Sequence, residues 1–152
     1  MPDEPTAPDP DAITSFIVET YPDTVVAHAM GGTFFACNEQ GWPNFATIAT
    51  GDEFDDASDL ARDGVFRLNI GVTGATFRRL LGDVTEPDYT ALDTPLPHPL
   101  YAQQHWVSIL NPSADSYETI VKPLLSEAHG IVSTREARIR EGRERKGSDE
   151  AG

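Results

Sequence analysis

The chain has 152 residues, of which 25 are acidic and 11 are basic, and its formal net charge at pH 7 is −14. This length suits a single domain with a sizeable core. The negative charge argues against general binding of nucleic acids through a basic face and against binding to anionic membranes. No apolar run approaches the ~18 residues that a membrane span needs, so we expect no membrane partner.

The basic residues are nine arginines and only two lysines, Lys122 and Lys146. Many acids, few lysines and many small side chains are typical of halophilic proteins, whose self-repulsion is screened by molar salt. An ordinary acidic protein from a GC-rich genome is the alternative. We expect the halophilic surface, since −14 exceeds the charge of about 2–8 that is usual for a small soluble domain. The single cysteine, Cys37, cannot form an internal disulfide and predicts a reducing, cytoplasmic setting.

Residues 1–9 carry three prolines and three acids and predict a disordered leader. Asp9 is placed to cap a helix that has Pro10 at its first position. The residues that follow at helical spacing predict a helix ending at Tyr21-Pro22, with one face formed by Ile13, Phe16, Ile17 and Thr20.

Three short β-prone runs follow, at 25–30, 33–38 and 44–50. The first two are joined by Gly31-Gly32, a two-residue link that favours positive φ and predicts a hairpin. Residues 51–63 are rich in acids and predict a loop with a short helical turn near 57–62, in which Asp56 or Ser58 is placed to act as a cap.

The run at 65–72 alternates and predicts a strand with two different faces. One face would carry Val65, Arg67, Asn69 and Gly71, and the other would carry the apolar residues Phe66, Leu68, Ile70 and Val72. Thr73 is placed to cap a short helix, and Gly82 occupies the C-terminal glycine position of that helix. Residues 83–97 predict a loop and residues 106–110 another strand.

The last predicted helix runs from about 114 to 133, with Pro123 as a kink. Residues 135–152 alternate Arg and Glu and are expected to form a charged tail whose end is disordered. The order of elements predicts one α+β domain at 10–134, a two-layer sandwich in which helices cover one face of an antiparallel sheet.

Several motifs together resemble a known family: GTFF (32–35), FATI (45–48), ASDL (57–60), FRLNIG (66–71), PHPLY (97–101), Trp106 and LNP (110–112). Over roughly residues 11–134 the chain resembles the uncharacterised bacterial and archaeal family DUF6194, which has no established activity to carry over. More distantly, the His-Trp pair in 104–108 is similar to the MmcQ/YjbR-like group, and this resemblance implies its architecture. Some members of that group are described as DNA-binding, but here Gln103 and Gln104 and the net charge oppose it.

No metal or cofactor site is predicted. The four histidines, His28, His98, His105 and His129, lack the spacing of known metal motifs, and Cys37 is expected to be a buried structural thiol. The acidic loop lacks the ligand pattern of a calcium-binding loop and is expected to be a solvated face. The run from Gly71 to Gly74, with Arg78 and Arg79 nearby, is part of a phosphate-binding motif, and a turn with a helix cap is the simpler interpretation.

Arg67 and Asn69 share the polar face of the strand at 65–72. A buried Arg67 would need a carboxylate from the acidic loop, whereas in a cleft it would recognise an anion. The proline-rich loop at 95–99 is stiff and leads into a segment with two imidazoles and two aromatic rings. We therefore predict a cavity bordered by at least two of His98, Tyr101, His105 and Trp106, with Arg67 or Asn69 on its wall.

These observations favour a small binding module, without metal, for an unknown small molecule or protein. Its candidate ligand-binding residues are Arg67, Asn69, His98, Tyr101, His105 and Trp106. The alternative is a small hydrolase or transferase with His98 or His105 as the general base. DNA binding is the third and weakest hypothesis, because the charge opposes it.

The acidic composition predicts a folded state that depends on salt. Raising KCl from about 0.1 M to 1 M and beyond shortens the Debye length from ~10 Å to ~3 Å and weakens repulsion among carboxylates. Thermal unfolding measured across this series should show a steep rise of the midpoint. A midpoint that stays flat would contradict the halophilic interpretation.

Overall fold

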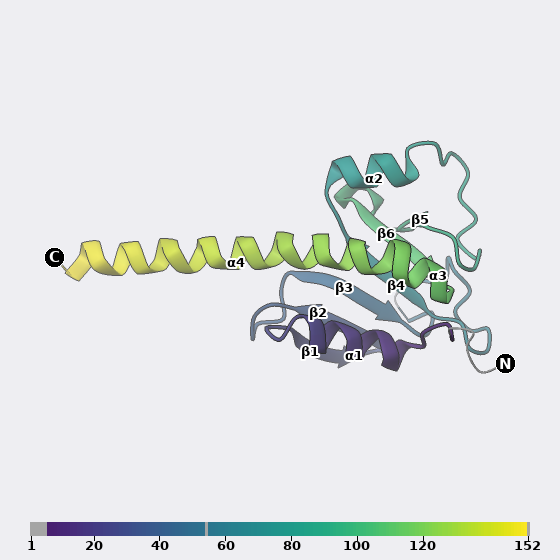
Figure 1. The fold of residues 1–152 in the computed structure, drawn as a ribbon, viewed down its shortest axis with the longest axis horizontal. Helices are drawn as coiled ribbons and strands as arrows, with labels where there is room; N and C mark the ends of the chain where they lie inside the picture. The colour runs from purple at the N-terminus through teal and green to yellow at the C-terminus, as the bar shows by residue number, and fades with distance from the viewer. Residues whose placement is uncertain (1–5, 54, 152) are drawn as a thin grey trace.

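The computed structural model describes residues 6–53 and 55–151. In this part of the chain, helices lie on one face of an antiparallel sheet of six strands in the order β1-β2-β3-β4-β6-β5 (Figure 1). The strands are β1 (Val25–Ala29), β2 (Gly32–Ala36), β3 (Asn44–Ala49), β4 (Arg67–Gly71), β5 (Leu96–Pro97) and β6 (Trp106–Leu110). The helices are α1 (Pro10–Thr20), α2 (Gly74–Leu81), the short α3 (Ala114–Ser116) and α4 (Lys122–Ala151). This confirms the predicted α+β class.

The first helix and hairpin follow from local sequence. The side chain of Asp9 accepts the amide hydrogen of Ala12 (2.8 Å), as predicted for the cap of α1. The hairpin of β1 and β2 is also present, but its turn is shifted by one residue. Because Ala29 pairs with Gly32, the two turn residues are Met30 and Gly31, at φ 51° and 75°. The prediction of a Gly31-Gly32 turn is therefore wrong in register, and a methionine adopts the left-handed conformation.

The helix side of the sheet holds the main core. Leu68 and Ile70 of β4 have no exposed surface, and Ile13 and Ile17 of α1 pack in the same cluster. Residues of the last helical region close this cluster, namely Val121, Leu124, Leu125, Ala128 and Val132. The alternation predicted for 65–72 is confirmed, because Arg67 and Asn69 lie outside this core and bond to each other.

Loops cover part of the opposite side of the sheet, around β4, whereas β1 is largely exposed there. A second, smaller apolar cluster lies there, formed by Ala49, Leu60, Leu96 and Leu110 with Val65 packed against it. Leu60 belongs to the acidic loop after β3, and Leu96 belongs to the segment that follows α2. The acidic loop and the segment after α2 therefore bury apolar side chains on this face, as the helices do on the other face.

Helix α2 begins at a side-chain cap and packs its apolar residues on the main core. Thr73 caps the helix as predicted, since its hydroxyl accepts the amide hydrogen of Thr76 (3.2 Å). Leu81 is buried, and Phe77 and Leu80 pack against the main core. Gly82 follows the helix with φ −59°, in the right-handed region, so α2 ends without the left-handed glycine that its position suggested.

The last helical region begins irregularly and continues far beyond the body. A π-helical turn, Tyr117–Val121, precedes Pro123. Proline lacks an N–H and crowds the preceding turn, so the irregularity expected there takes the form of a widened turn. From Lys122 the helix runs to Ala151, past its predicted end at 133, and Figure 1 shows it extending away from the sheet. None of the described helices is both long and apolar enough to span a membrane.

We predict that residues 140–152 contribute little to stability. Val132 is the last residue of α4 in the main core, and the later part of the helix extends beyond the body (Figure 1). Deleting 140–152 should move the thermal midpoint by no more than about 2 °C. A control deletion after Gly130 removes Val132 and should lower the midpoint much further. A loss of several degrees from the shorter deletion would show that the tail stabilises the body.

Candidate functional site

A row of polar side chains crosses the loop-covered face of the sheet. Thr47 of β3, Asn69 of β4 and Ser108 of β6 are paired in register on adjacent strands. Asn69 donates from Nδ2 to Oγ1 of Thr47 (3.0 Å) and accepts at Oδ1 from the hydroxyl of Ser108 (2.8 Å). These bonds join three strands through their side chains as well as through their backbones.

Arg67 connects this row to the acidic loop. Its side chain is 2% exposed, and its guanidinium forms two parallel bonds with Asp55, from Nη1 to Oδ1 (2.9 Å) and from Nη2 to Oδ2 (2.6 Å). Nε also donates to Asn69 (3.0 Å), and Nη1 donates to the hydroxyl of Ser58 (3.0 Å). Such a two-fold pair is strong because the planar fork matches the carboxylate. The hydrogen bonds from Arg67 are the main cause that lowers the pKa of Asp55 below its ordinary value.

Arg67 thus forms the buried ion pair with the acidic loop, which was one of its two interpretations. The expectation that the acidic loop is a solvated face is corrected at Asp55, whose side chain is only 9% exposed. Ser58 is also buried, and its hydroxyl accepts from Arg67 within a segment that forms turns and no helix. Because the bonds of the guanidinium are directed at protein groups, Arg67 does not present a free fork to an external anion.

His98 lies beside this ion pair and is held in one orientation. It is 5% exposed, and its Nδ1 accepts the amide hydrogens of Leu100 (3.0 Å) and Tyr101 (3.1 Å). Burial lowers its pKa to about 4, the positive charge of Arg67 contributes, and the negative charge of Asp55 opposes the shift. At neutral pH His98 is therefore uncharged, with its proton on Nε2.

Tyr101 and His105 lie farther along the same segment, outside the buried row. Tyr101 is 51% exposed, and its ring centre lies 4.9 Å from that of His98. His105 ends the short 3₁₀ turn Ala102–Gln104 with φ 66° and packs its ring 5.7 Å from that of Phe77. His105 therefore belongs with α2 rather than with Arg67.

Trp106 begins β6, beside the end of β4 that is farther from Arg67. It pairs with Gly71, where an added Cβ would come within 3.1 Å of the indole ring, so glycine leaves room for the indole. The structure therefore brings three of the six candidates, Arg67, Asn69 and His98, to one region. Tyr101 lies at the margin of this region, with its ring centre 4.9 Å from that of His98. His105 packs against Phe77, and Trp106 pairs with Gly71 at the other end of β4.

Two open hollows lie elsewhere on the surface. One is formed mainly by 50–53 and 60–66, and the other lies along α4 between Glu127 and Arg138. None of the six candidate residues lines either hollow. The predicted cavity around His98, Tyr101, His105 and Trp106 is not one of these two and stays a prediction.

The first turn of α2, considered above for phosphate binding, contacts a carboxylate of the protein itself. Glu127 of α4 accepts the amide hydrogen of Thr73 (3.0 Å) and the hydroxyl hydrogen of Thr76 (2.6 Å). A carboxylate is favoured at a helix N-terminus for the same reason as a phosphate. The turn-and-cap interpretation of 71–74 therefore describes this segment.

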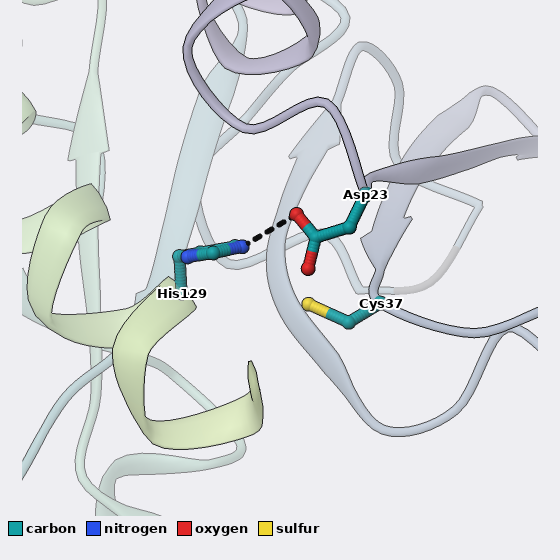
Figure 2. Close-up of side chains that lie close together, drawn as sticks. All are labelled: Asp23, Cys37 and His129. Carbon is teal, nitrogen blue, oxygen red and sulfur yellow. Dashed lines mark hydrogen bonds and ion pairs between the residues drawn. The ribbon is translucent and has the colours of Figure 1, made fainter. Parts of the chain in front are cut away.

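A second group of chemically active side chains lies on the helix side of the sheet, at one end. Asp23 follows α1, Cys37 follows β2 and His129 lies on α4, and their side chains point toward one another (Figure 2). One ligand atom from each lies within 4.8 Å of the others, and Nε2 of His129 is 2.8 Å from Oδ1 of Asp23. We call this group the Asp–Cys–His cluster.

Burial raises the pKa of the Cys37 thiol to about 12, and the charge of Asp23, a hydrogen bond with Asp23 and the charge of Glu136 add to this effect. Sequence inspection missed the Asp–Cys–His cluster, because Asp23 and His129 are 106 positions apart and share no motif. The expectation that Cys37 is buried is confirmed at 5% exposure.

A family model described as "Family of unknown function (DUF6194)" matches residues 8–142. The chain belongs to the DUF6194 family. The matched range contains the buried row, the Arg67–Asp55 pair and the Asp–Cys–His cluster, so all of these lie within the DUF6194 region. No curated protein and no solved structure matches the chain significantly.

In this DUF6194 protein, breaking the Arg67–Asp55 pair should be costly. Asp55→Asn keeps the shape of the side chain but leaves a buried cation without its anion, and this should reduce the free energy of unfolding by about 3 kcal/mol. Urea-induced unfolding measures the change. Glu118→Gln is the matched control, because Glu118 is 63% exposed in its pair with Lys122 and should cost at most ~0.5 kcal/mol.

The same comparison has a defined pH dependence. Because the folded-state pKa of Asp55 is lowered, the stability from the pair is present above the unfolded pKa of ~3.9 and is lost as the pH falls through the folded value. The gap between wild type and Asp55→Asn should therefore shrink on acidification below about pH 4. Equal small losses in both variants would contradict a stabilising role for the pair.

Proposed function

We propose that this protein is a binding module that recognises a protein partner through the turn at 98–101. The construction of this turn carries the proposal. Buried His98 accepts the amide hydrogens of both Leu100 and Tyr101. These two residues are 55% and 51% exposed. The turn therefore exposes two large side chains, and hydrogen bonds to buried His98 fix its backbone.

The rigidity of the turn favours recognition. Pro97 and Pro99 flank His98 and restrict the backbone, and the amide of His98 donates to the carbonyl of Trp106 (3.0 Å). A preorganised segment loses little conformational entropy when a partner covers it, so more of the contact energy becomes affinity. Exposed aromatic and aliphatic side chains of this kind act as anchors in the pocket of a partner.

A protein partner fits this shape better than a small molecule. Small ligands bind in concave sites that bury most of their surface. Leu100 and Tyr101 are exposed, and the two hollows described above are lined by other residues. The side chains of the turn would thus enter a groove on the partner rather than enclose a ligand.

The enzyme alternative has little support from His98. A general base needs a free lone pair and a pKa near the working pH. Nδ1 of His98 already accepts two amide hydrogens, and its pKa is lowered to about 4. His105 keeps that alternative open, although its ring packs against Phe77. For DNA binding, the charge of −14 remains the opposing argument.

We extend the proposal to the cellular location, the salt adaptation and the architecture of the protein. The single, buried cysteine supports a cytoplasmic location. The excess of acids supports a surface adapted to high salt. The His-Trp pair that enters β6 before the final helix supports a YjbR-like architecture.

Photo-crosslinking tests the proposed surface. A photoreactive aromatic residue in place of Tyr101, in cells that naturally make the protein, should give one protein adduct of defined mass. Excess wild-type protein should compete with it. The control places the same residue at Trp42, which is 70% exposed in the loop between β2 and β3, and should give no such adduct.

Replacing the two anchors should remove the interaction. Leu100→Ser combined with Tyr101→Ser should weaken affinity for the crosslinked partner by about 30-fold or more, because buried anchors each contribute ~2 kcal/mol. Identical adducts at both positions, or unchanged affinity in the double variant, would overturn the proposal. A small-molecule adduct at position 101 alone would favour the small-ligand hypothesis instead.

A further inference from the structure

The Asp–Cys–His cluster takes no part in the proposed partner binding. Its three members come from three separate segments, after α1, after β2 and on α4 (Figure 2). They offer one oxygen, one sulfur and one nitrogen, all within 4.8 Å of one another. Among the described residues, no other group of three such side chains converges in this way.

These distances suit a shared metal ion. Zinc binds oxygen and nitrogen at about 2.0–2.2 Å and sulfur at about 2.3 Å, so tetrahedral geometry separates the donor atoms by roughly 3.3–3.7 Å. Nε2 of His129 lies 2.8 Å from Oδ1 of Asp23, and no two donor atoms of the cluster are more than 4.8 Å apart. The donor separations required for zinc fall between these two values. Small side-chain movements would therefore complete the geometry. We propose that Asp23, Cys37 and His129 bind a zinc-like divalent cation.

The contacts within the cluster show how a cation would be accommodated. Asp23 is the centre of the group, bonded to the imidazole of His129 and to the thiol of Cys37. On binding a divalent ion, the Cys37 thiol would release its proton to solvent, and His129 would bind through the lone pair of Nε2 with its ring proton on Nδ1. The thiolate and carboxylate would balance its two positive charges, and the negative charge of Glu136 acts on the same site. The charge of the surroundings therefore favours a cation.

The neighbouring rings keep the ligands in place. Tyr21 stacks on the ring of His129, with 4.3 Å between ring centres, and Phe45 meets that ring edge-on at 5.4 Å. Cys37 is 5% exposed, whereas the side chain of Asp23 is 48% exposed, so an ion would enter from the side of Asp23.

The donor set also selects the type of metal. A thiolate with an imidazole and a carboxylate suits zinc and similar borderline ions, whereas calcium and magnesium prefer oxygen alone. Three protein ligands leave a fourth position, as in zinc sites that hold a water or a substrate. The sequence-based expectation of no metal rested on spacing within the chain, and the three ligands meet only in the folded protein.

Cobalt(II) is the probe, because a cobalt–thiolate bond has a near-ultraviolet charge-transfer band. Cys37 is the single cysteine, so this band reports on one site without ambiguity. Titrating the full chain with Co²⁺ should produce the band with a one-to-one end point, and one equivalent of Zn²⁺ should abolish it. Zinc at a hundredfold excess over its dissociation constant should also raise the thermal midpoint by roughly 5 °C.

Variants decide which residues are ligands. Asp23→Asn keeps the exposed shape of Asp23 and should weaken cobalt binding by about 10- to 100-fold, and His129→Gln should do the same. Cys37→Ala should abolish the band. Circular dichroism without metal verifies that each variant is folded. The matched controls, Asp88→Asn and His28→Gln, remove an exposed carboxylate and an exposed imidazole elsewhere and should bind cobalt as the wild type does.

Two outcomes would overturn the proposal. Cobalt binding without a thiolate band would mean that the acidic surface holds the ion without Cys37. A thiolate band that keeps its full affinity in folded Asp23→Asn and His129→Gln variants would mean that these two residues are not ligands. Neither result depends on whether the turn at 98–101 binds a partner.

Discussion

The buried pair between Arg67 and Asp55 holds the acidic loop against the face of the sheet that the helices leave uncovered. Helices cover one face, and loops, which lack the regular bonding of helices, cover the other face around β4. Asp55 reaches from the acidic loop to a charge on β4, and two parallel bonds hold it there. Arg62 of the same loop donates to the carbonyl of Thr90, which ties the acidic loop to the segment after α2. The acidic loop is thus bonded to the sheet through Asp55 and to the segment after α2 through Arg62.

The same pair influences the surface proposed for recognition. Burial is the main cause that lowers the pKa of His98 and keeps its imidazole neutral; the positive charge of Arg67 adds to this effect, and the negative charge of Asp55 opposes it. A neutral ring with a free lone pair on Nδ1 is what allows His98 to accept the amide hydrogens of Leu100 and Tyr101. Burial therefore keeps His98 uncharged, and the uncharged histidine fixes the turn that exposes Leu100 and Tyr101.

Local periodicity predicted much of the fold, because burial on one face imposes it. The spacing of Ile13 and Ile17 and the alternation around Arg67 were sufficient to place a helix and a two-faced strand correctly. The hairpin was misplaced by one residue, because register is determined by pairing across the strands and Met30 accepts a positive φ. The long C-terminal helix was underestimated, because charged residues at helical spacing lack the apolar stripe by which buried helices are detected.

The candidate sites were less predictable than the fold. Arg67 on a polar strand face indicated a carboxylate partner, but several acids of the loop were equivalent in sequence and only the folded chain selects Asp55. The Asp–Cys–His cluster left no local signal, since its members are brought together by packing between α1, β2 and α4. Chemistry that depends on distant segments follows from topology, which short motifs do not encode.

Backbone amide hydrogen exchange in wild type and Asp55→Asn tests most directly whether one ion pair secures both loops. Leu60 bonds to Asp52 within the acidic loop, and Tyr101 bonds to His98 within the later segment. If the pair anchors both loops, the amides of Leu60 and Tyr101 lose protection together in Asp55→Asn, by similar factors. Loss of protection at Leu60 with Tyr101 unchanged would contradict the account, because the turn at 98–101 would then be held independently of the pair.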